Sequence, residues 1–264
     1  MSDALRAARQ HAETARLLGV DFVPMYRVTQ DDEPDPAATE PAAGPIIEAK
    51  PAAPVATGDK RAALDALRAR YEQDAPHKNF VTAFTNIVWG DGDPDARLVF
   101  IGEAPGEEED KLGKPFVGRS GALLNKMIEA MGLSRETVYI CNVLKTRPVN
   151  NATPTPSEIE ACAPYLHEQV AIIDPACIVT LGLPAAKAVL RCDANATMGS
   201  LRSRWAQMCL PGGKIIPVMP TYHPAFLLRS YTPENRQKVW SDLQMVMQKL
   251  GLQTGARPSP ASSA

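Results

Sequence analysis

The sequence predicts an α/β fold of three layers, in which helices cover both faces of a central four-stranded parallel sheet. Strand and helix patterns alternate from about residue 98 to residue 250, and such alternation is typical of doubly wound parallel sheets. The first strand signal is the uninterrupted apolar run Leu98-Val99-Phe100-Ile101, which favours a strand buried on both faces. An amphipathic helix pattern over about 233–250 ends the alternation.

The elements between these two follow in chain order. We expect further strands over 138–143, 177–181 and 215–219, and helices over about 120–131, 155–173 and 184–190. The clearest helix start is Thr155-Pro156-Ser157-Glu158. Its threonine suits the N-cap, its proline suits the first helical position, and its glutamate completes a capping box. Four strands separated by helices therefore support a parallel sheet.

The chain divides into four expected parts. Residues 1–28 form a helical segment, since apolar residues recur near helical spacing from Asp3 to Val23. Residues 29–60 form a Pro/Ala-rich disordered linker, because six prolines between Pro34 and Pro54 block a regular helix. Residues 61–251 form the folded domain. The small and polar residues 252–264 form a disordered tail.

Bulk composition excludes several classes of protein. The net charge is −2, so any contact with nucleic acid must rely on local basic clusters. Five cysteines without close pairs, and an N-terminus without an apolar signal core, indicate a reducing cytoplasm. No apolar run approaches the ~20 residues that a membrane span requires. We therefore expect a cytoplasmic protein with no membrane contact, and we expect a monomer.

The loop after the first strand is unusual in composition. Ligands of open α/β sheets bind beyond the carboxyl ends of the strands, and here the first such loop reads Gly102-Glu103-Ala104-Pro105-Gly106, followed by Glu107-Glu108-Glu109-Asp110. Glycine and proline allow a fixed turn close to a ligand, and a carboxylate can orient water. Taken alone, the loop is better explained as a solvated acidic segment. The neighbouring motifs decide between these readings.

Four motifs in fixed order resemble the family 4 uracil-DNA glycosylases. They are Gly102–Gly106, then Pro115-Phe116-Val117-Gly118, then Cys141-Asn142-Val143-Leu144-Lys145 with Arg147-Pro148, and finally Tyr222-His223-Pro224-Ala225 with Leu227-Leu228-Arg229. The resemblance runs from about residue 64 to residue 250. It implies the uracil-DNA glycosylase fold, with a four-stranded parallel sheet and the lesion bound at one end. The strand pattern alone agrees with that fold.

The resemblance also implies a role for five residues. Glu103 matches the position near the attacking water, and Ala104 contributes backbone beside the base. Phe116 matches the aromatic residue that stacks on flipped uracil. Asn142 matches the side chain that reads the uracil edge, where a carboxamide can accept from N3–H and donate to O4. His223 matches the histidine facing O2, where a hydrogen bond stabilises negative charge on the leaving base.

Further residues are implied at the DNA surface. The segment 223–229 resembles the family's minor-groove loop, in which Leu227 or Leu228, with Phe226 as a further candidate, fills the gap left by the extruded base. Arg229 belongs to this DNA-binding set. Glu109 matches an acidic position beside the site, although a solvated role fits it as well. The basic residues expected to pair with phosphates are Lys114, Arg119, Lys145, Arg147 and Arg229.

The sequence departs from the family at its iron–sulfur cluster. Family 4 enzymes usually hold a 4Fe–4S cluster with four cysteines, and the matching positions here are Ala75, Lys78, Thr146 and Cys162. Only Cys162 is retained, and the other three side chains do not replace thiolates. We therefore expect no cluster and no other metal. The segment 77–84 would then be held by ordinary packing, through Phe80 and Phe84.

The function implied is hydrolysis of uracil from single- and double-stranded DNA, which leaves an abasic site. A related covalent-trapping loop is replaced here by 150–154, so no covalent adduct is expected. One alternative is a catalytically silent DNA-binding module that kept the pocket. Another is an unrelated nucleotide-processing α/β enzyme, which the lack of a glycine-rich phosphate-binding fingerprint disfavours.

Overall fold

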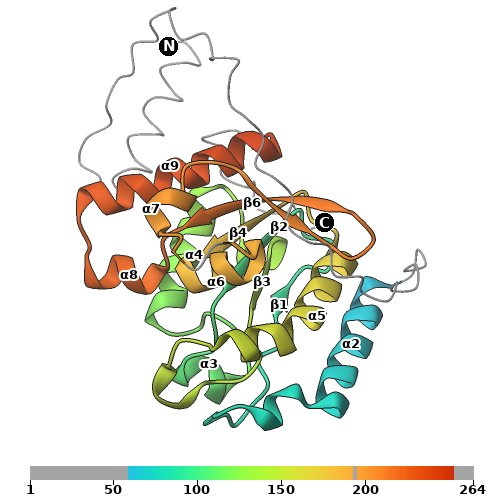
Figure 1. Cartoon of the computed structure of the whole chain (residues 1–264). Helices are drawn as coiled ribbons and strands as arrows, with labels where there is room; N and C mark the ends of the chain where they lie inside the picture. Colours follow the sequence, from blue (N-terminus) through green and yellow to red (C-terminus); the bar gives the residue numbers. More distant parts are fainter. Residues whose placement is uncertain (1–58, 193–194, 253–264) are drawn as a thin grey trace, which may run out of the picture.

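The computed structural model describes residues 59–192 and 195–252 (Figure 1). The helical segment and most of the linker predicted within residues 1–58, and the tail from residue 253, lie outside the described residues. The linker was predicted to run to residue 60, but helix α2 (Lys60–Asp74) already begins there. The Asp59 carboxylate caps this helix by accepting from the backbone N–H groups of Arg61 and Ala62.

The sheet has six strands in the order β1-β3-β2-β4-β6-β5. Their bounds are β1 Asp91–Gly92, β2 Leu98–Gly102, β3 Tyr139–Asn142, β4 Cys177–Leu181, β5 Ala206–Cys209 and β6 Ile215–Thr221. The four central strands β3, β2, β4 and β6 are parallel, as predicted. The edge strands β1 and β5 are antiparallel to their neighbours and were not predicted, because β1 has two residues and β5 is largely exposed.

The helices agree with the sequence pattern where they are long. Their bounds are α3 Glu107–Leu112, α4 Arg119–Ala130, α5 Pro156–Ile173, α6 Leu183–Leu190, α7 Met198–Leu201, α8 Pro224–Arg229 and α9 Pro233–Leu250, with 3-10 turns at Pro76–Asn79, Arg135–Thr137 and Val149–Asn151. The capping box is confirmed, since Glu158 accepts from the Thr155 N–H at 2.7 Å and donates its own N–H to the Thr155 hydroxyl. The short helices α3 and α8 fall in segments that the sequence analysis treated as loops.

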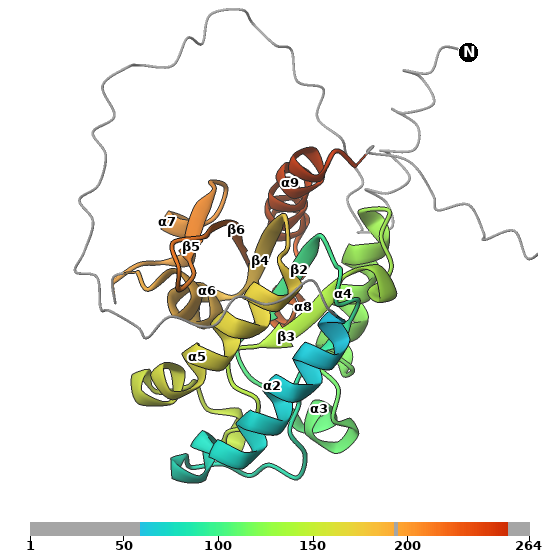
Figure 2. The same cartoon turned by 90° about the vertical axis from the view of Figure 1, so that its right-hand side faces the viewer.

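The two faces of the sheet are covered by different helices (Figures 1 and 2). Successive side chains of a strand point to opposite faces. Accordingly Val99 and Ile101 of β2 pack with residues of α2 and α5, whereas Leu98 and Phe100 pack with α4 and α9. The three-layer fold class is therefore confirmed. None of the helices within residues 59–192 and 195–252 is both long and apolar enough to cross a membrane.

Candidate active site

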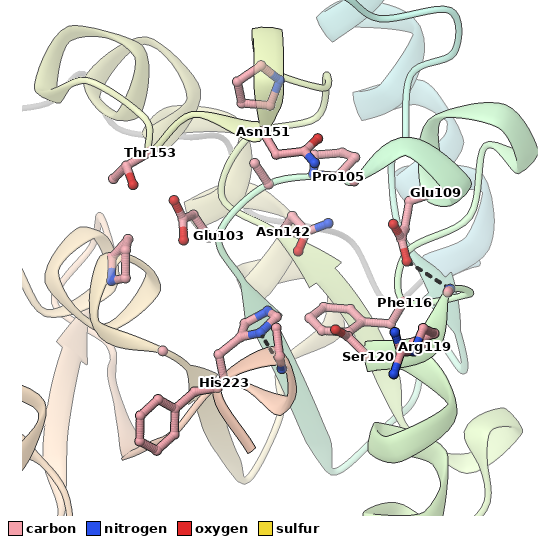
Figure 3. Close-up of a pocket in the computed structure, with 18 of the residues that line it drawn as sticks. Glu103, Pro105, Glu109, Phe116, Arg119, Ser120, Asn142, Asn151, Thr153 and His223 are labelled. Atoms are coloured by element: carbon pink, nitrogen blue, oxygen red, sulfur yellow. Dashed lines mark hydrogen bonds between the residues drawn. The ribbon is translucent and has the colours of Figure 1, made fainter. Parts of the chain in front are cut away.

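A cleft of about 920 Å³ lies at the carboxyl edge of the parallel strands. This volume is within the range of about 300–1,000 Å³ typical of small-molecule sites. The cleft is lined by residues that follow β2, β3, β4 and β6. It brings together all five residues that the resemblance assigned to catalysis or uracil binding, namely Glu103, Ala104, Phe116, Asn142 and His223. Figure 3 labels all of these except Ala104.

Asn142 presents an unpartnered amide oxygen. It ends β3, its side chain is 1% exposed, and its Oδ1 is buried without a hydrogen-bond partner. The backbone that follows is fixed, because the N–H groups of Val143 and Leu144 donate to the carbonyls of Gly102 and Glu103. A buried acceptor without a donor costs free energy. Asn142 is therefore arranged to accept a hydrogen bond from a ligand in the cleft.

Lys145 lies beneath this strand end and not on the DNA surface. Its side chain is fully buried, and its Nζ donates to the Asn142 carbonyl at 2.8 Å and to the Gln169 Oε1 at 2.6 Å. The ammonium also lies 5.1 Å from the centroid of the Trp89 ring. The prediction that Lys145 pairs with a phosphate is therefore wrong, because burial removes it from any DNA backbone.

Gly102 leaves the space that two cleft side chains occupy. A Cβ at this position would lie 2.3 Å from the Asn142 Oδ1 and 2.6 Å from the Phe116 Cζ. Such distances are well inside van der Waals contact. Glycine at the end of β2 is therefore a requirement of the side chains that enter the cleft, and this explains the first residue of the Gly102–Gly106 motif.

Phe116 stands in the cleft on a strained backbone. Its φ of 51° is positive, which is an outlier for a bulky side chain. The ring is 5% exposed, and its centroid lies 5.6 Å from that of the His223 ring. Figure 3 shows both rings projecting into the same side of the cleft. The strained turn thus carries a flat apolar face beside the imidazole.

Two charged side chains hold the Phe116 turn. The Arg135 guanidinium donates to the backbone carbonyls of residues 115 and 116, and the Glu109 carboxylate accepts from the N–H groups of residues 117 and 118, both at 3.0 Å. Glu109 is therefore not simply solvated, because it shapes the turn. The sequence does not predict this role of Arg135, since nothing in its spacing indicates a contact 19 residues away.

His223 is held as a neutral imidazole with a defined tautomer. It caps α8, and its Nδ1 accepts from the Ala225 N–H at 3.0 Å. A ring nitrogen that accepts carries no proton, so the neutral ring bears its proton on Nε2. Burial, and then the positive charge of Arg229, lower the pKa of His223 to about 4, against a small opposing effect of Glu109. The Nε2–H is thus free to donate to a ligand.

Glu103 supplies a carboxylate on the other side of Asn142 from Phe116 (Figure 3). Burial raises the pKa of Glu103, and a hydrogen bond from Thr153 partly offsets this effect. Thr153 lines the same cleft and was not predicted, because only the fold brings the segment 150–154 to the end of β2. Ala104 is half-buried next to Glu103. The site therefore combines a carboxylate, an amide and a neutral imidazole.

Comparison with known proteins agrees with this geometry. A sequence model described as the uracil DNA glycosylase superfamily matches residues 89–244. The chain belongs to this superfamily. The type-4 uracil-DNA glycosylase of Thermotoga maritima is 46% identical over 160 residues, 61% of this chain and 81% of the relative. That of Archaeoglobus fulgidus is 44% identical over 168 residues, 63% and 83% of the two chains.

The type-4 branch is the more similar one. A type-5 uracil-DNA glycosylase of Thermus thermophilus is 30% identical over 151 residues, 52% of this chain and 68% of the relative, which is well below the type-4 values. The resemblance to type-4 enzymes predicted from the four motifs is thus confirmed, as is the fold that it implied.

The predicted minor-groove segment of this superfamily member is the helix α8. Leu227 is 3% exposed and packs in the core with α4 and α9, which contradicts the expectation that it serves as the wedge. The next residue, Leu228, is 37% exposed, and Arg229 beside it is exposed. Phe226 is half-buried and stacks on Tyr222, with 4.6 Å between the ring centroids. Leu228 is therefore the apolar side chain of this helix that faces solvent.

The remaining basic residues of the predicted DNA surface are accessible to different degrees. Lys114, Arg119 and Arg229 are exposed, and the last two line the cleft. Arg147 is partly buried, and its Nε donates to the Asn151 Oδ1 at 3.0 Å. Of these four side chains, Arg119 and Arg229 line the cleft, whereas Lys114 and Arg147 do not.

The cluster positions of the type-4 pattern do not fit a 4Fe–4S cluster. Thr146 and Cys162 are fully buried, Ala75 is nearly so, and Lys78 is exposed. One thiol, one hydroxyl and one methyl group do not make a set of iron ligands. Within the described part of the chain, no group of three or more His, Cys, Asp or Glu side chains is placed to hold a metal ion.

Proposed function

We propose that this chain is a monofunctional uracil-DNA glycosylase. It hydrolyses the bond between a flipped uracil and its deoxyribose and leaves an abasic site in DNA. The observation that carries the proposal is the buried, unpartnered Oδ1 of Asn142 at the base of a cleft that also holds the His223 Nε2–H. The type-4 relatives, which are named uracil-DNA glycosylases, support it.

Asn142 selects the base through its carboxamide. Its Oδ1 accepts from the uracil N3–H, and its Nδ2 donates to O4. Cytosine has an acceptor at N3 and an amino donor at C4, so it opposes both groups of the amide. The contacts that fix the backbone around Asn142 keep the amide in one place. Cytosine would therefore leave two polar groups unsatisfied in a buried site.

His223 and Glu103 act on the two fragments of the breaking bond. As the bond between C1′ and N1 breaks, its electron pair moves to the base and a positive charge develops on the sugar. The His223 Nε2–H donates to O2 and stabilises the negative charge on the leaving uracil. Glu103 orients a water molecule, whose oxygen adds to C1′ and whose proton passes to the carboxylate or to solvent. Phe116 stacks on the extruded base.

The DNA contacts of the proposal come from the rim of the cleft. Arg119 and Arg229 neutralise phosphates near the flipped nucleotide, and Leu228 enters the space that the base leaves. We also propose that the protein acts as a monomer in the cytoplasm. Its buried thiols Cys141, Cys162 and Cys177 support a reducing compartment.

The test is release of free uracil from an oligonucleotide with one deoxyuridine, in single-stranded and duplex form. We expect free uracil and an alkali-labile abasic site, and no release from matched oligonucleotides with cytosine or thymine at that position. Recovery of intact oligonucleotide bound to the protein would overturn the proposal and favour a silent DNA-binding module. An electrophoretic strand-cleavage assay and direct detection of the base together distinguish these outcomes.

A further inference from the structure

A group of buried aromatic rings lies where three of the four positions that match iron–sulfur ligands meet. These positions are Ala75, Thr146 and Cys162. We call Tyr71, His77, Trp89 and Tyr165 the aromatic plug. Tyr71 lies on α2. Its backbone carbonyl accepts a hydrogen bond from the N–H of Ala75, which lies one turn further along the chain. Its hydroxyl lies beside the thiol of Cys162 and the hydroxyl of Thr146. One side chain therefore contacts the surroundings of all three positions.

The Tyr71 ring is the centre of the plug. It is completely buried, stacks on His77 with 5.4 Å between the centroids, and meets the edge of Tyr165 at 5.0 Å. Trp89 lies 5.6 Å from it. The three partners come from the turn after α2, from α5 and from the segment before β1. Tyr71 thus joins elements far apart in sequence, which is what a cluster with four protein ligands does.

Polar atoms in this region lack partners. The Tyr71 hydroxyl, the Thr146 hydroxyl and the His77 Nδ1 are buried without a hydrogen bond of good geometry. Buried polar atoms are normally hydrogen-bonded, so this part of the core is only partly optimised as an apolar interior. Hydroxyl groups and one thiol stand here, and not the thiolates that iron requires.

The plug is connected to the wall of the cleft. The chain that follows Thr146 pairs with the segment after His77, since the Ala83 N–H donates to the Arg147 carbonyl at 3.0 Å and Thr82 forms a bridge with Pro148. Pro148 and residues 151–153 line the cleft, and Thr153 hydrogen-bonds to Glu103. Movement in the plug would therefore reach the carboxylate through a short run of backbone.

From these contacts we propose that the aromatic plug replaces the 4Fe–4S cluster of the type-4 relatives. The plug ties α2, the segment 75–84, the loop 146–149 and α5 together without iron, and it keeps the 146–153 wall of the cleft in place. Phe80 and Phe84, which were expected to hold this region, lie only at its margin. Phe80 packs at the edge of the core and Phe84 is 37% exposed, with its ring edge-on to His77.

The first measurement uses the unmodified full-length chain. Iron analysis and absorbance spectroscopy of anaerobically purified protein should find no stoichiometric iron and no broad band near ~400 nm. A preparation with about four irons per chain would overturn the proposal, because the plug and a cluster compete for the same positions. This readout does not depend on enzymatic activity.

The second measurement removes the ring. Tyr71→Ala should lower the thermal midpoint by roughly 6–20 °C, the range expected for deletion of a buried aromatic side chain from a domain of this size. Hydrogen exchange should accelerate in residues 146–153. Tyr71→Phe keeps the ring and should change the midpoint by no more than about 4 °C. Tyr231→Ala, at an aromatic residue that is 48% exposed, is the matched control and should change neither.

These outcomes separate the plug from the proposed function. If Tyr71→Ala fails to fold, Tyr71→Leu retains an apolar core residue and should show the same faster exchange in residues 146–153. Exchange in that segment at the rate of the unmodified protein would overturn the proposal. If the unmodified chain releases no uracil while the iron and exchange results hold, only the proposed function fails.

Discussion

The cleft and the aromatic plug differ in how far they keep the residues of the type-4 pattern. In the cleft, the residues of the type-4 pattern are present, and they stand in costly arrangements: an amide oxygen without a partner, an aromatic residue at positive φ and a glycine with no room for a methyl group. At the plug, three of the four matching positions carry different side chains, and ordinary packing fills the region. A reaction site needs particular atoms at particular positions, whereas a site that only holds elements together needs side chains that fill the space and make contacts.

The comparison predicts that cleft variants lose activity with little loss of stability. His223→Ala should show the largest effect, a fall in kcat of about 10²–10³-fold, as for removal of one donor to a developing anion. The same change at His167, buried on α5 outside the cleft lining, is the control and should leave kcat within a few-fold. Single-turnover kinetics on a deoxyuridine oligonucleotide measure both. Equal effects at the two histidines would remove His223 from the reaction.

Asn142→Asp should have the next largest effect. The change replaces the Nδ2 donor with an oxygen and places a carboxylate in a buried position. Loss of one hydrogen bond and an unsatisfied partner cost on the order of 1–3 kcal/mol, or roughly 5–150-fold in kcat/KM for uracil. Discrimination between uracil and cytosine should fall as well. Unchanged kcat/KM values for both bases would show that this amide does not read the base.

Arg135→Met tests the hold on the Phe116 turn. The variant removes the donors to the carbonyls of residues 115 and 116 and should reduce kcat/KM about tenfold, since the strained turn then relaxes. Arg135→Lys keeps the charge without the fork and should recover only part of the loss. Recovery of kcat on addition of guanidinium to the Met variant would support positioning. A loss of thermal stability with kcat intact would contradict it.

The smallest effect concerns pH and stability. The pKa of His223 is about 4 in the folded chain, against an ordinary value of 6.5, so the unfolded state binds its proton more readily between these values. The contribution of His223 to the free energy of unfolding is complete above pH 6.5 and is lost as the pH falls towards 4. Chemical denaturation across this range should show a smaller decline for His223→Asn than for the unmodified chain.

The pH profile of activity should separate the two proposed catalytic groups, Glu103 and His223. Burial raises the pKa of Glu103 while the pKa of His223 lies at about 4, so loss of activity towards acid reports the protonation of Glu103. Glu103→Gln should have low activity that does not depend on pH between about 5 and 8. A persistent acidic limb in this variant would assign the titration to another group.

The sequence was most informative about elements with strong periodicity. The four parallel strands were predicted within one or two residues, because apolar runs buried on both faces have little other explanation. The edge strands and the short helices α3 and α8 were missed, since they contain few buried residues or lie in an acidic stretch. Local pattern does not determine elements whose stability comes from tertiary contacts.

Site residues were predicted where a sequence motif identifies them. They were missed where only the three-dimensional fold determines their position. Lys145 was predicted to lie on the surface, because a lysine within a basic stretch is usually solvated. The fold instead buries it. Leu227 and Leu228 are adjacent and chemically equal, so only helix α8 decides which of them faces solvent. Tyr71 contacts Cys162 across 91 positions, and no spacing rule predicts such a pair.

His223 caps the helix that carries Leu228 and Arg229, and this has a mechanical consequence. The imidazole proposed to act on the leaving base and the side chains proposed to meet the duplex belong to one short helix, which is capped at its start by the Nδ1 contact with Ala225. Any tilt of α8 on a DNA strand would also turn the imidazole. In the proposed reaction, contact of α8 with the strand and alignment of the imidazole would therefore happen together.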